Sequence, residues 1–297
     1  MMNNATLLKK YELTDKQIQQ IQHRIIKTET YKKSPVVFPK TIILGAQPGS
    51  GKTELQKIAE QNFKYNAVIC NPDNFRDFHP KALEIKKFHE NLYPELTAKY
   101  GHHWNLGLQK HCRENKLNYI LETTFKDGQQ LNQTISAIKT HDFNVDIMLL
   151  AVNAKLSIVG IHARFEDQKN IKNFGRSVSM KDHDLRYNAI PLALKEVADA
   201  SLFDNISIYG RNIFVDGDAY KSGIHLIAKN PVGKFSVTDI FLKERNRAIS
   251  QKELSFLNIE IKNVISLMEK RNAGIADIES FKESVGISNE LKRTFKR

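Results

Sequence analysis

The fold can be predicted from one stretch of the chain: Thr41-Ile42-Ile43-Leu44-Gly45-Ala46-Gln47-Pro48-Gly49-Ser50-Gly51-Lys52-Thr53. The stretch opens with an apolar run typical of a buried strand, and a helix-forming segment, residues 54–62, follows it. A strand, a glycine-rich turn and a helix in this order, with Lys-Thr ending the turn, predict a phosphate-binding P-loop. The alternative interpretation is a chance glycine-rich turn between a strand and a helix. A P-loop makes a nucleoside triphosphate the expected ligand.

Each residue type in the loop has a chemical purpose. Gly49 and Gly51 allow a tight turn whose N–H groups face an anion. Lys52 supplies a cation for the β- and γ-phosphates, and Thr53 supplies a hydroxyl for Mg²⁺. Ala46 stands where the usual pattern has glycine, which the turn tolerates if φ is negative at that position. The expected nucleotide-binding residues are Gln47, Pro48, Gly49, Ser50, Gly51, Lys52 and Thr53.

Composition predicts a globular protein with one large domain, or with one domain and a small appendage. The chain has 297 residues, of which 41% are hydrophobic and 26% are charged. No apolar run approaches the roughly 20 residues that cross a bilayer, and the first residues contain no signal-peptide core. We therefore expect a cytoplasmic location with no membrane contact, and export into another cell stays open. Cys70 and Cys112 form no CxxC pair, which argues against a zinc site or a disulfide framework.

The net charge of +12 is the one unusual bulk property. It suits nucleic acid, a phosphate-rich small substrate or an acidic protein partner. No zinc-finger or RNP pattern is present, and the basic residues are scattered except near the end of the chain, at Lys292-Arg293 and Lys296-Arg297. A solvated basic surface explains this charge equally well. We therefore do not expect nucleic acid as a partner.

Strand-like and helix-like segments alternate along the chain. The expected strands are 41–45, 67–70, 119–121, 145–152 and 206–209, and the expected helices between them are 53–62, 81–98, 104–115, 129–141, 155–166 and 181–200. This alternation predicts an α/β fold of the P-loop kinase type, with a mostly parallel sheet and helices on both faces. Residues 213–216 are expected to form a hairpin with 206–209 through the turn Gly210-Arg211-Asn212.

We expect three units along the chain. Residues 1–40 form a helical segment that packs on the central domain, with an amphipathic helix over 14–31 capped by Thr14. Residues 41–230 form the P-loop domain. Residues 231–297 form a C-terminal helical appendage, with helices at 236–247, 251–271 and 275–285 and with Ser250 as a cap.

Polar residues follow the predicted strands, where ligands bind in such sheets. Asp73 follows the second strand, Glu122 ends the third, and Arg164 and then Arg176 follow the fourth. Phosphoryl transfer needs a carboxylate that accepts the proton of the attacking hydroxyl and cations that offset charge on the transferring group. Asp73 is our candidate for the base, and Asp77 is its competitor.

These candidates have simpler interpretations. Either aspartate could cap or solvate the helix that follows. Glu122 emerges from an apolar strand, so it binds substrate or metal, or it forms a structural ion pair. Arg164 and Arg176 could each be surface residues.

The ordered set of motifs resembles the zeta toxin family of P-loop kinases over roughly residues 12–270. The family's loop Gly-Gly-Gln-Pro-Gly-Ser-Gly-Lys-Thr matches Gly45 to Thr53 with only Ala46 different. The further family motifs are similar to Asn71-Pro72-Asp73-Asn74-Phe75…His79-Pro80, Leu121-Glu122-Thr123-Thr124, Arg164-Phe165-Glu166, Arg176 and His183-Asp184…Asn188-Ala189-Ile190-Pro191. Here Asn71 replaces the family's first aspartate, and Thr123 replaces a glycine.

The resemblance implies an ATP- or GTP-dependent kinase that uses Mg²⁺. Such a kinase phosphorylates the 3′-hydroxyl of the amino sugar of UDP-N-acetylglucosamine and blocks peptidoglycan synthesis, and a small helical antitoxin occludes its nucleotide site. The resemblance also implies roles for single residues. Asp73 would deprotonate the sugar hydroxyl, Thr53 would hold Mg²⁺, Lys52, Arg164 and Arg176 would stabilise the transferring phosphoryl, and Glu122 and Thr124 would contact the sugar. Thr123 adds bulk beside Glu122 and leaves the sugar specificity open.

Two other functions stay open at this point. One is a P-loop phosphotransferase that acts on another small hydroxyl compound, such as an antibiotic. The other is a nucleotide-dependent nucleic-acid-binding protein without kinase turnover, whose binding would fall steeply with salt.

Overall fold

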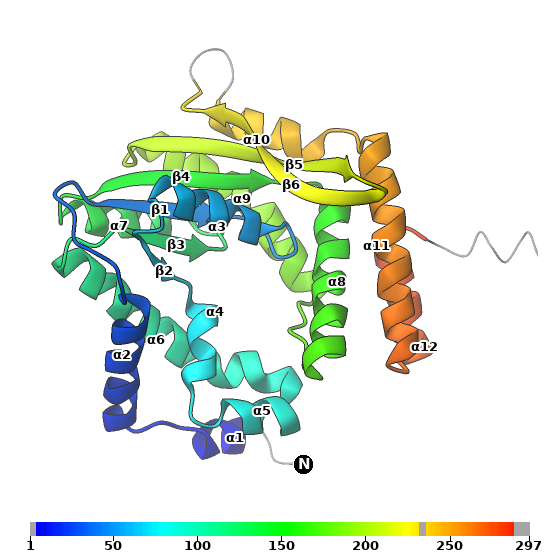
Figure 1. Cartoon of the computed structure of the whole chain (residues 1–297), viewed down its shortest axis with the longest axis horizontal. Coiled ribbons are helices and arrows are strands. Elements are labelled where there is room, and N and C mark those ends of the chain that lie inside the picture. The colour runs from blue at the N-terminus through cyan, green and yellow to red at the C-terminus, as the bar shows by residue number, and fades with distance from the viewer. Residues whose placement is uncertain (1–3, 232–235, 288–297) are drawn as a thin grey trace, which may run out of the picture.

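A six-stranded sheet lies between helices in the computed structural model, which describes residues 4–231 and 236–287 (Figure 1). Its strands run in the spatial order β2-β3-β1-β4-β5-β6, and all neighbours are parallel except β5 and β6. The bounds are β1 (Lys40–Gly45), β2 (Val68–Cys70), β3 (Tyr119–Thr123), β4 (Asn144–Ala151), β5 (Asn205–Asp216) and β6 (Ala219–Lys229). The predicted α/β fold with a mostly parallel sheet is confirmed.

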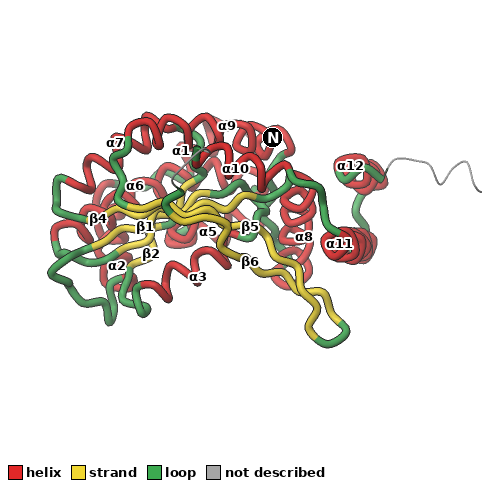
Figure 2. Tube along the Cα trace, turned by 90° about the horizontal axis from the view of Figure 1, so that it is seen from above, coloured by secondary structure: helices red, strands yellow, loops and turns green. Residues whose placement is uncertain are grey.

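Helices cover both faces of the sheet because successive strand residues point to opposite faces. In β1, Ile43 belongs to one buried apolar cluster, whereas Ile42 and Leu44 belong to the other. The first cluster includes residues of α2 (Asp15–Glu29), α6 (Tyr93–Glu114), α7 (Gly128–Lys139), α9 (Met180–Ala200) and α10 (Val237–Asn246). The second includes residues of α3 (Lys52–Asn62), α8 (Ala154–Lys172), α11 (Gln251–Lys270) and α12 (Ile275–Ser284). Figure 2 shows α7, α9 and α10 on one side of the strands and α3 on the other.

The helix caps expected from the sequence are present. Thr14 and Gln17 form a reciprocal capping box at the start of α2, and Ser250 and Glu253 form another at the start of α11. The N-terminal segment contacts α6, where Trp104 Nε1 donates to the carbonyl of Ile18 at 3.1 Å. The division into units at 1–40, 41–230 and 231–297 stays a prediction. The basic residues Lys292, Arg293, Lys296 and Arg297 lie outside the described residues.

The helical region expected at 81–98 and 104–115 is divided differently. The short helix α5 (Ala82–Phe88) ends before His89, and α6 then runs unbroken from Tyr93 to Glu114. Gly101 lies within α6, where a Cβ would overlap the carbonyl of Pro72. Glycine at this position therefore allows α6 to approach the segment after β2, which consists of α4 (Pro72–Phe75) and a 3-10 turn (Arg76–Phe78). The remaining short helices are α1 (Asn4–Lys10) and a 3-10 turn (Glu90–Leu92).

The predicted hairpin turn at Gly210-Arg211-Asn212 is wrong. These residues lie inside β5, paired with β6 in the register Gly210 to His225 and Arg211 to Ile224. The turn comes later, at Gly217, whose φ of 60° lies in the left-handed region. Strand β6, which the sequence analysis missed, is only partly buried along its length. Within the described residues, no helix is long and apolar enough to cross a membrane.

Candidate active site

A cavity of about 700 Å³ opens at the carboxyl ends of the parallel strands. Its walls come from the P-loop, from the segments after β2 and β3, and from α8, α9, β5 and α11. Almost all of the predicted site residues line this one cavity: Gln47, Pro48, Gly49, Gly51, Lys52, Thr53, Asp73, Glu122, Thr124, Arg164 and Arg176. The exception is the loop residue Ser50, which is buried.

The P-loop has the backbone conformation that its glycines predict. Gly49 and Gly51 have φ values of 75° and 91°, in the region that favours glycine. A Cβ on Gly51 would overlap the guanidinium of Arg211, so this glycine also allows a close contact. Ala46 has a negative φ and is buried, which explains why alanine is tolerated there.

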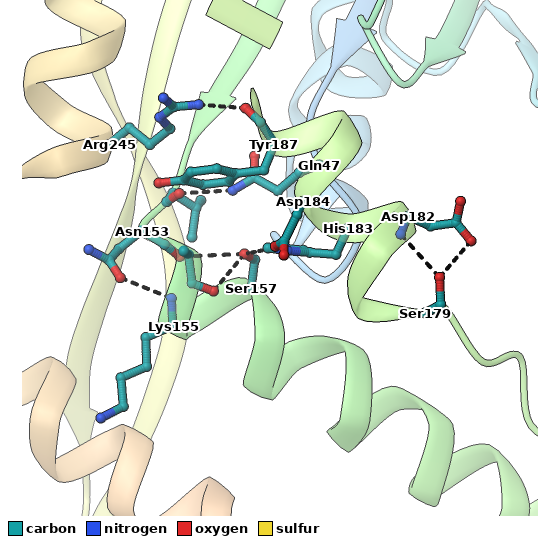
Figure 3. Close-up of polar contacts among 12 residues, drawn as sticks. Gln47, Asn153, Lys155, Ser157, Ser179, Asp182, His183, Asp184, Tyr187 and Arg245 are labelled. Atoms are coloured by element: carbon teal, nitrogen blue, oxygen red, sulfur yellow. Dashed lines mark hydrogen bonds and ion pairs between the residues drawn. The ribbon is translucent and has the colours of Figure 1, made fainter. Parts of the chain in front are cut away.

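The side chains of Gln47 and Ser50 form hydrogen bonds that hold the loop in its conformation. Gln47 Nε2 donates to the carbonyl of Val152 at 2.8 Å, and Ser50 Oγ donates to the carbonyl of Gln47 at 2.8 Å. The first of these bonds joins the loop to the residue that follows β4 (Figure 3). Any contribution of these two residues to nucleotide binding therefore comes chiefly from their backbone, as is usual for P-loops.

A buried polar network supports α8 behind the loop (Figure 3). His183 is fully buried, with Nε2 at 2.8 Å from Ser157 Oγ and Nδ1 at 2.9 Å from Asp184 Oδ1. Arg245 of α10 donates to the carbonyl of Tyr187 at 2.6 Å. These contacts join α8, α9 and α10, so the His183-Asp184 motif holds the scaffold rather than lining the cavity.

Lys52 points across the mouth of the loop towards β3. Its Nζ donates to the carbonyl of Thr123 at 3.0 Å and lies 3.9 Å from Glu122 Oε2. Burial lowers the pKa of Lys52, while the charges of Glu122 and Asp73 oppose that shift. The ammonium is thus placed between the loop and the two candidate carboxylates.

Asp73 sits between two arginines. Its carboxylate forms an ion pair with Arg76 at 2.7 Å and another with Arg176. Burial alone would raise its pKa, but the charges of Arg176 and Arg76 outweigh burial, so the pKa of Asp73 lies below its ordinary value. Asn71 caps the short helix α4 by accepting the backbone N–H of Asp73 at 3.0 Å. The carboxylate is therefore ionised and fixed in position.

Asp77, the competing candidate, is engaged elsewhere. It accepts a hydrogen bond from the Tyr93 hydroxyl and forms an ion pair with Lys86 at 2.6 Å. It lines a smaller hollow of about 410 Å³ beside Asp73, and not the cavity that contains the P-loop. Of the two aspartates, Asp73 is therefore the one that lines the same cavity as the P-loop.

Glu122 and its neighbours form the other wall near Lys52. Burial raises the pKa of Glu122, and the charge of Lys52 opposes this shift. Thr124 lines the cavity. Thr123 turns its hydroxyl into the protein, where it lies 3.3 Å from the carbonyl of Leu44 and accepts the N–H of Phe125 at 3.0 Å. The hydroxyl of Thr123 is thus accommodated by hydrogen bonds with the backbone of Leu44 and Phe125.

Arginines from distant elements surround the site. Arg164 has two buried nitrogens, Nε and Nη2, without a hydrogen-bond partner among the described residues. The sequence analysis missed Arg76, Arg186 and Arg211. Arg76 could have been found, because it lies one helical turn after Asp73. Arg186 and Arg211 come from α9 and β5 and carry no local signal.

Comparisons with known proteins identify relatives of this chain in sequence and in structure. The zeta toxin family model matches residues 22–230. The chain is 24% identical to Toxin zeta of Streptococcus agalactiae over 82% of each chain, and 25% identical to Toxin PezT of Streptococcus pneumoniae serotype 4 over 87% of this chain and 98% of that protein. A structure from the PezAT chromosomal toxin-antitoxin system of S. pneumoniae has a TM-score of 0.74 at 22% identity, covering 87% of this chain and 98% of that one. A chain of the AvrRxo1-ORF1:AvrRxo1-ORF2 complex has a TM-score of 0.52 at 12% identity, covering 94% and 83%. The two structural likenesses show the fold.

Proposed function

This chain belongs to the zeta toxin family, and we propose that it is a kinase that transfers a phosphoryl group from ATP or GTP to the 3′-hydroxyl of the amino sugar of UDP-N-acetylglucosamine. One observation carries the proposal. Asp73, Glu122 and the P-loop lysine Lys52 line the same cavity, and both carboxylates act on the charge of Lys52. An acceptor hydroxyl beside Asp73 would face the γ-phosphate held by the loop.

The proposed transfer is a direct displacement. The Asp73 carboxylate accepts the hydroxyl proton, and the hydroxyl oxygen forms the new bond to the γ-phosphorus. The bond from that phosphorus to the β–γ bridging oxygen breaks, and the nucleoside diphosphate leaves. Lys52, Arg164 and Arg176 offset the negative charge on the transferring group. Glu122 and Thr124 contact the sugar and orient its hydroxyl.

The residues at the loop fit a magnesium ion. Thr53 opens α3 next to Lys52, and its side chain is exposed to the cavity. Mg²⁺ is usually bound through few protein oxygens together with the substrate phosphates. Thr53 would supply such an oxygen, and the bound ion would neutralise charge on the β- and γ-phosphates.

We also propose a toxin role with a small helical antitoxin as partner. Support comes from relatives named toxins and from the likeness to a toxin-antitoxin structure. If the role holds, expression in a wall-bearing bacterium causes lysis. Expression of folded protein without any growth defect would contradict it.

Acceptor-dependent turnover tests the substrate. We expect UDP-N-acetylglucosamine to raise steady-state ADP release from ATP-Mg²⁺ by at least about 100-fold, because orienting the acceptor hydroxyl supplies much of the catalysis. Aminoglycosides and simple sugars serve as the comparison acceptors. Stimulation by one of those compounds instead would favour an antibiotic phosphotransferase. Steep loss of nucleic-acid binding with salt, without turnover, would favour a nucleic-acid-binding protein.

A further inference from the structure

One end of the main cavity contains none of the residues that are assigned to the proposed transfer. The P-loop follows β1, and the segments with Asp73 and Glu122 follow β2 and β3, on one side of β1 in the sheet. Arg211 lies on β5, two strands from β1 on the other side, at a spacing of about 4.8 Å for each strand. The cavity therefore extends past the loop in both directions.

The charges divide the cavity in the same way. Lys52 is influenced by Glu122, Asp73, Arg176 and Arg164. The pKa of Arg211 is lowered by burial and is influenced by Glu54, Glu260 and Glu253. A triphosphate whose γ-phosphate faced Asp73 would have room for its α-phosphate and its base towards Arg211.

Two residues of α11 form the wall at this end. Phe256 and Glu260 are four residues apart, so they share one face of the helix, and both line the cavity. Helix α11 lies beside α8 (Figures 1 and 2). It is fixed there by the buried Glu166 of α8, which accepts hydrogen bonds from Arg271 at 2.6 and 2.8 Å. The wall is therefore held in place independently of a ligand.

Polar side chains at this end can form hydrogen bonds in addition to those in the structure. Arg211 donates to the carbonyl of Ser50 at 2.7 Å, and its buried Nε has no partner among the described residues. Glu260 accepts a hydrogen bond of 3.4 Å from Asn263 and forms no ion pair within 4.0 Å in the described part of the chain. Phe256 is half-buried, which leaves part of its ring open to the cavity.

We infer that this end of the cavity binds the purine base of the phosphoryl donor, stacked on Phe256, and that Glu260 selects guanine over adenine. The inference rests on the proposed kinase function. Aromatic rings stack on any base, so Phe256 supplies affinity without selectivity. An ionised carboxylate only accepts hydrogen bonds. Guanine presents N1–H and its 2-amino group side by side as donors, whereas adenine presents one amino donor beside the N1 acceptor.

Binding of non-hydrolysable imido analogues of GTP and ATP, with Mg²⁺, tests the inference by calorimetry. Burial raises the pKa of Glu260, so we choose about pH 8 to keep it ionised. We expect wild-type protein to bind the guanine analogue at least about 10-fold more tightly. Glu260→Gln should remove that preference, and Phe256→Ala should weaken both analogues by about 10-fold or more. Glu269→Gln, an exposed site on the same helix outside the cavity, is the matched control and should change neither.

Inorganic tripolyphosphate separates this inference from the proposed function. It has no base, so its binding reports the P-loop alone and also shows that the Phe256 and Glu260 variants are folded. We expect Lys52→Ala to lose tripolyphosphate binding. If it does, but wild-type protein binds the two analogues equally or Glu260→Gln keeps the preference, the base assignment is overturned and the kinase proposal stands. Failure of wild-type protein to bind any of the three ligands would overturn both.

Discussion

Lys52→Ala is expected to lower the turnover number for ADP release by at least about 10²–10³-fold, which is the usual cost of removing one charge that stabilises a transition state. Lys52 is half-buried at the mouth of the P-loop, where its Nζ lies 3.9 Å from Glu122 Oε2 and donates a hydrogen bond to the carbonyl of Thr123. In the proposed complex its ammonium faces the β- and γ-phosphates, and alanine would leave that charge without a substitute. Steady-state ADP release with saturating acceptor is the measurement.

The matched control is Lys57→Ala on the same helix. Lys57 is exposed and forms an ion pair with Glu54 at 2.9 Å, outside the residues that line the cavity. Its replacement should leave turnover within about threefold of wild type, because exposed ion pairs contribute little. Similar turnover in Lys52→Ala and Lys57→Ala would show that the loop lysine has no catalytic part.

Asp73→Asn should lower turnover by about 10²–10⁴-fold while nucleotide binding stays within a few-fold of wild type. The amide has the size of the carboxylate but cannot accept the hydroxyl proton. Ordinary aspartate carboxyls have a pKa of about 4. Because Arg176 and Arg76 lower the pKa of Asp73, the wild-type rate should begin to fall only at a pH below that value. Single-turnover rates, combined with equilibrium binding of the ATP analogue, separate the chemical step from binding.

Asp77→Asn is the decisive comparison, because sequence alone left both aspartates as candidates. Asp77 is held by Tyr93 and Lys86 in the neighbouring hollow. Asp77→Asn should lower turnover by less than about 10-fold. If Asp77→Asn lowered turnover more than Asp73→Asn did, the assignment of Asp73 as the base would be wrong.

Local signals predicted the parts of the site that lie on single turns and strand ends. The strand-turn-helix order at residues 41–62 identified the P-loop, and the capping residues Thr14 and Ser250 identified two helix starts. These features depend on residues close in sequence, so they can be found without a structure. The hairpin failed for the converse reason. Both Gly210 and Gly217 suit a turn, and the choice depends on how far β5 extends beside β6.

Roles that depend on tertiary neighbours could not be predicted. Asp73 and Asp77 lie four residues apart with similar surroundings in sequence, and only the fold places one in the main cavity. Arg186 and Arg211 reach the cavity from α9 and β5, far along the chain. His183 stands out as a polar motif, but burial against Ser157 makes it part of the scaffold.

The most direct test of the proposed kinase is the mass of UDP-N-acetylglucosamine after incubation with the protein and ATP-Mg²⁺. The account predicts a gain of one phosphate on the sugar nucleotide, in amounts equal to the ADP released, with the phosphorus–proton coupling in NMR placing it on the 3′-oxygen. Binding of ATP without any phosphorylated sugar nucleotide, by protein that is shown to be folded, would contradict the substrate assignment.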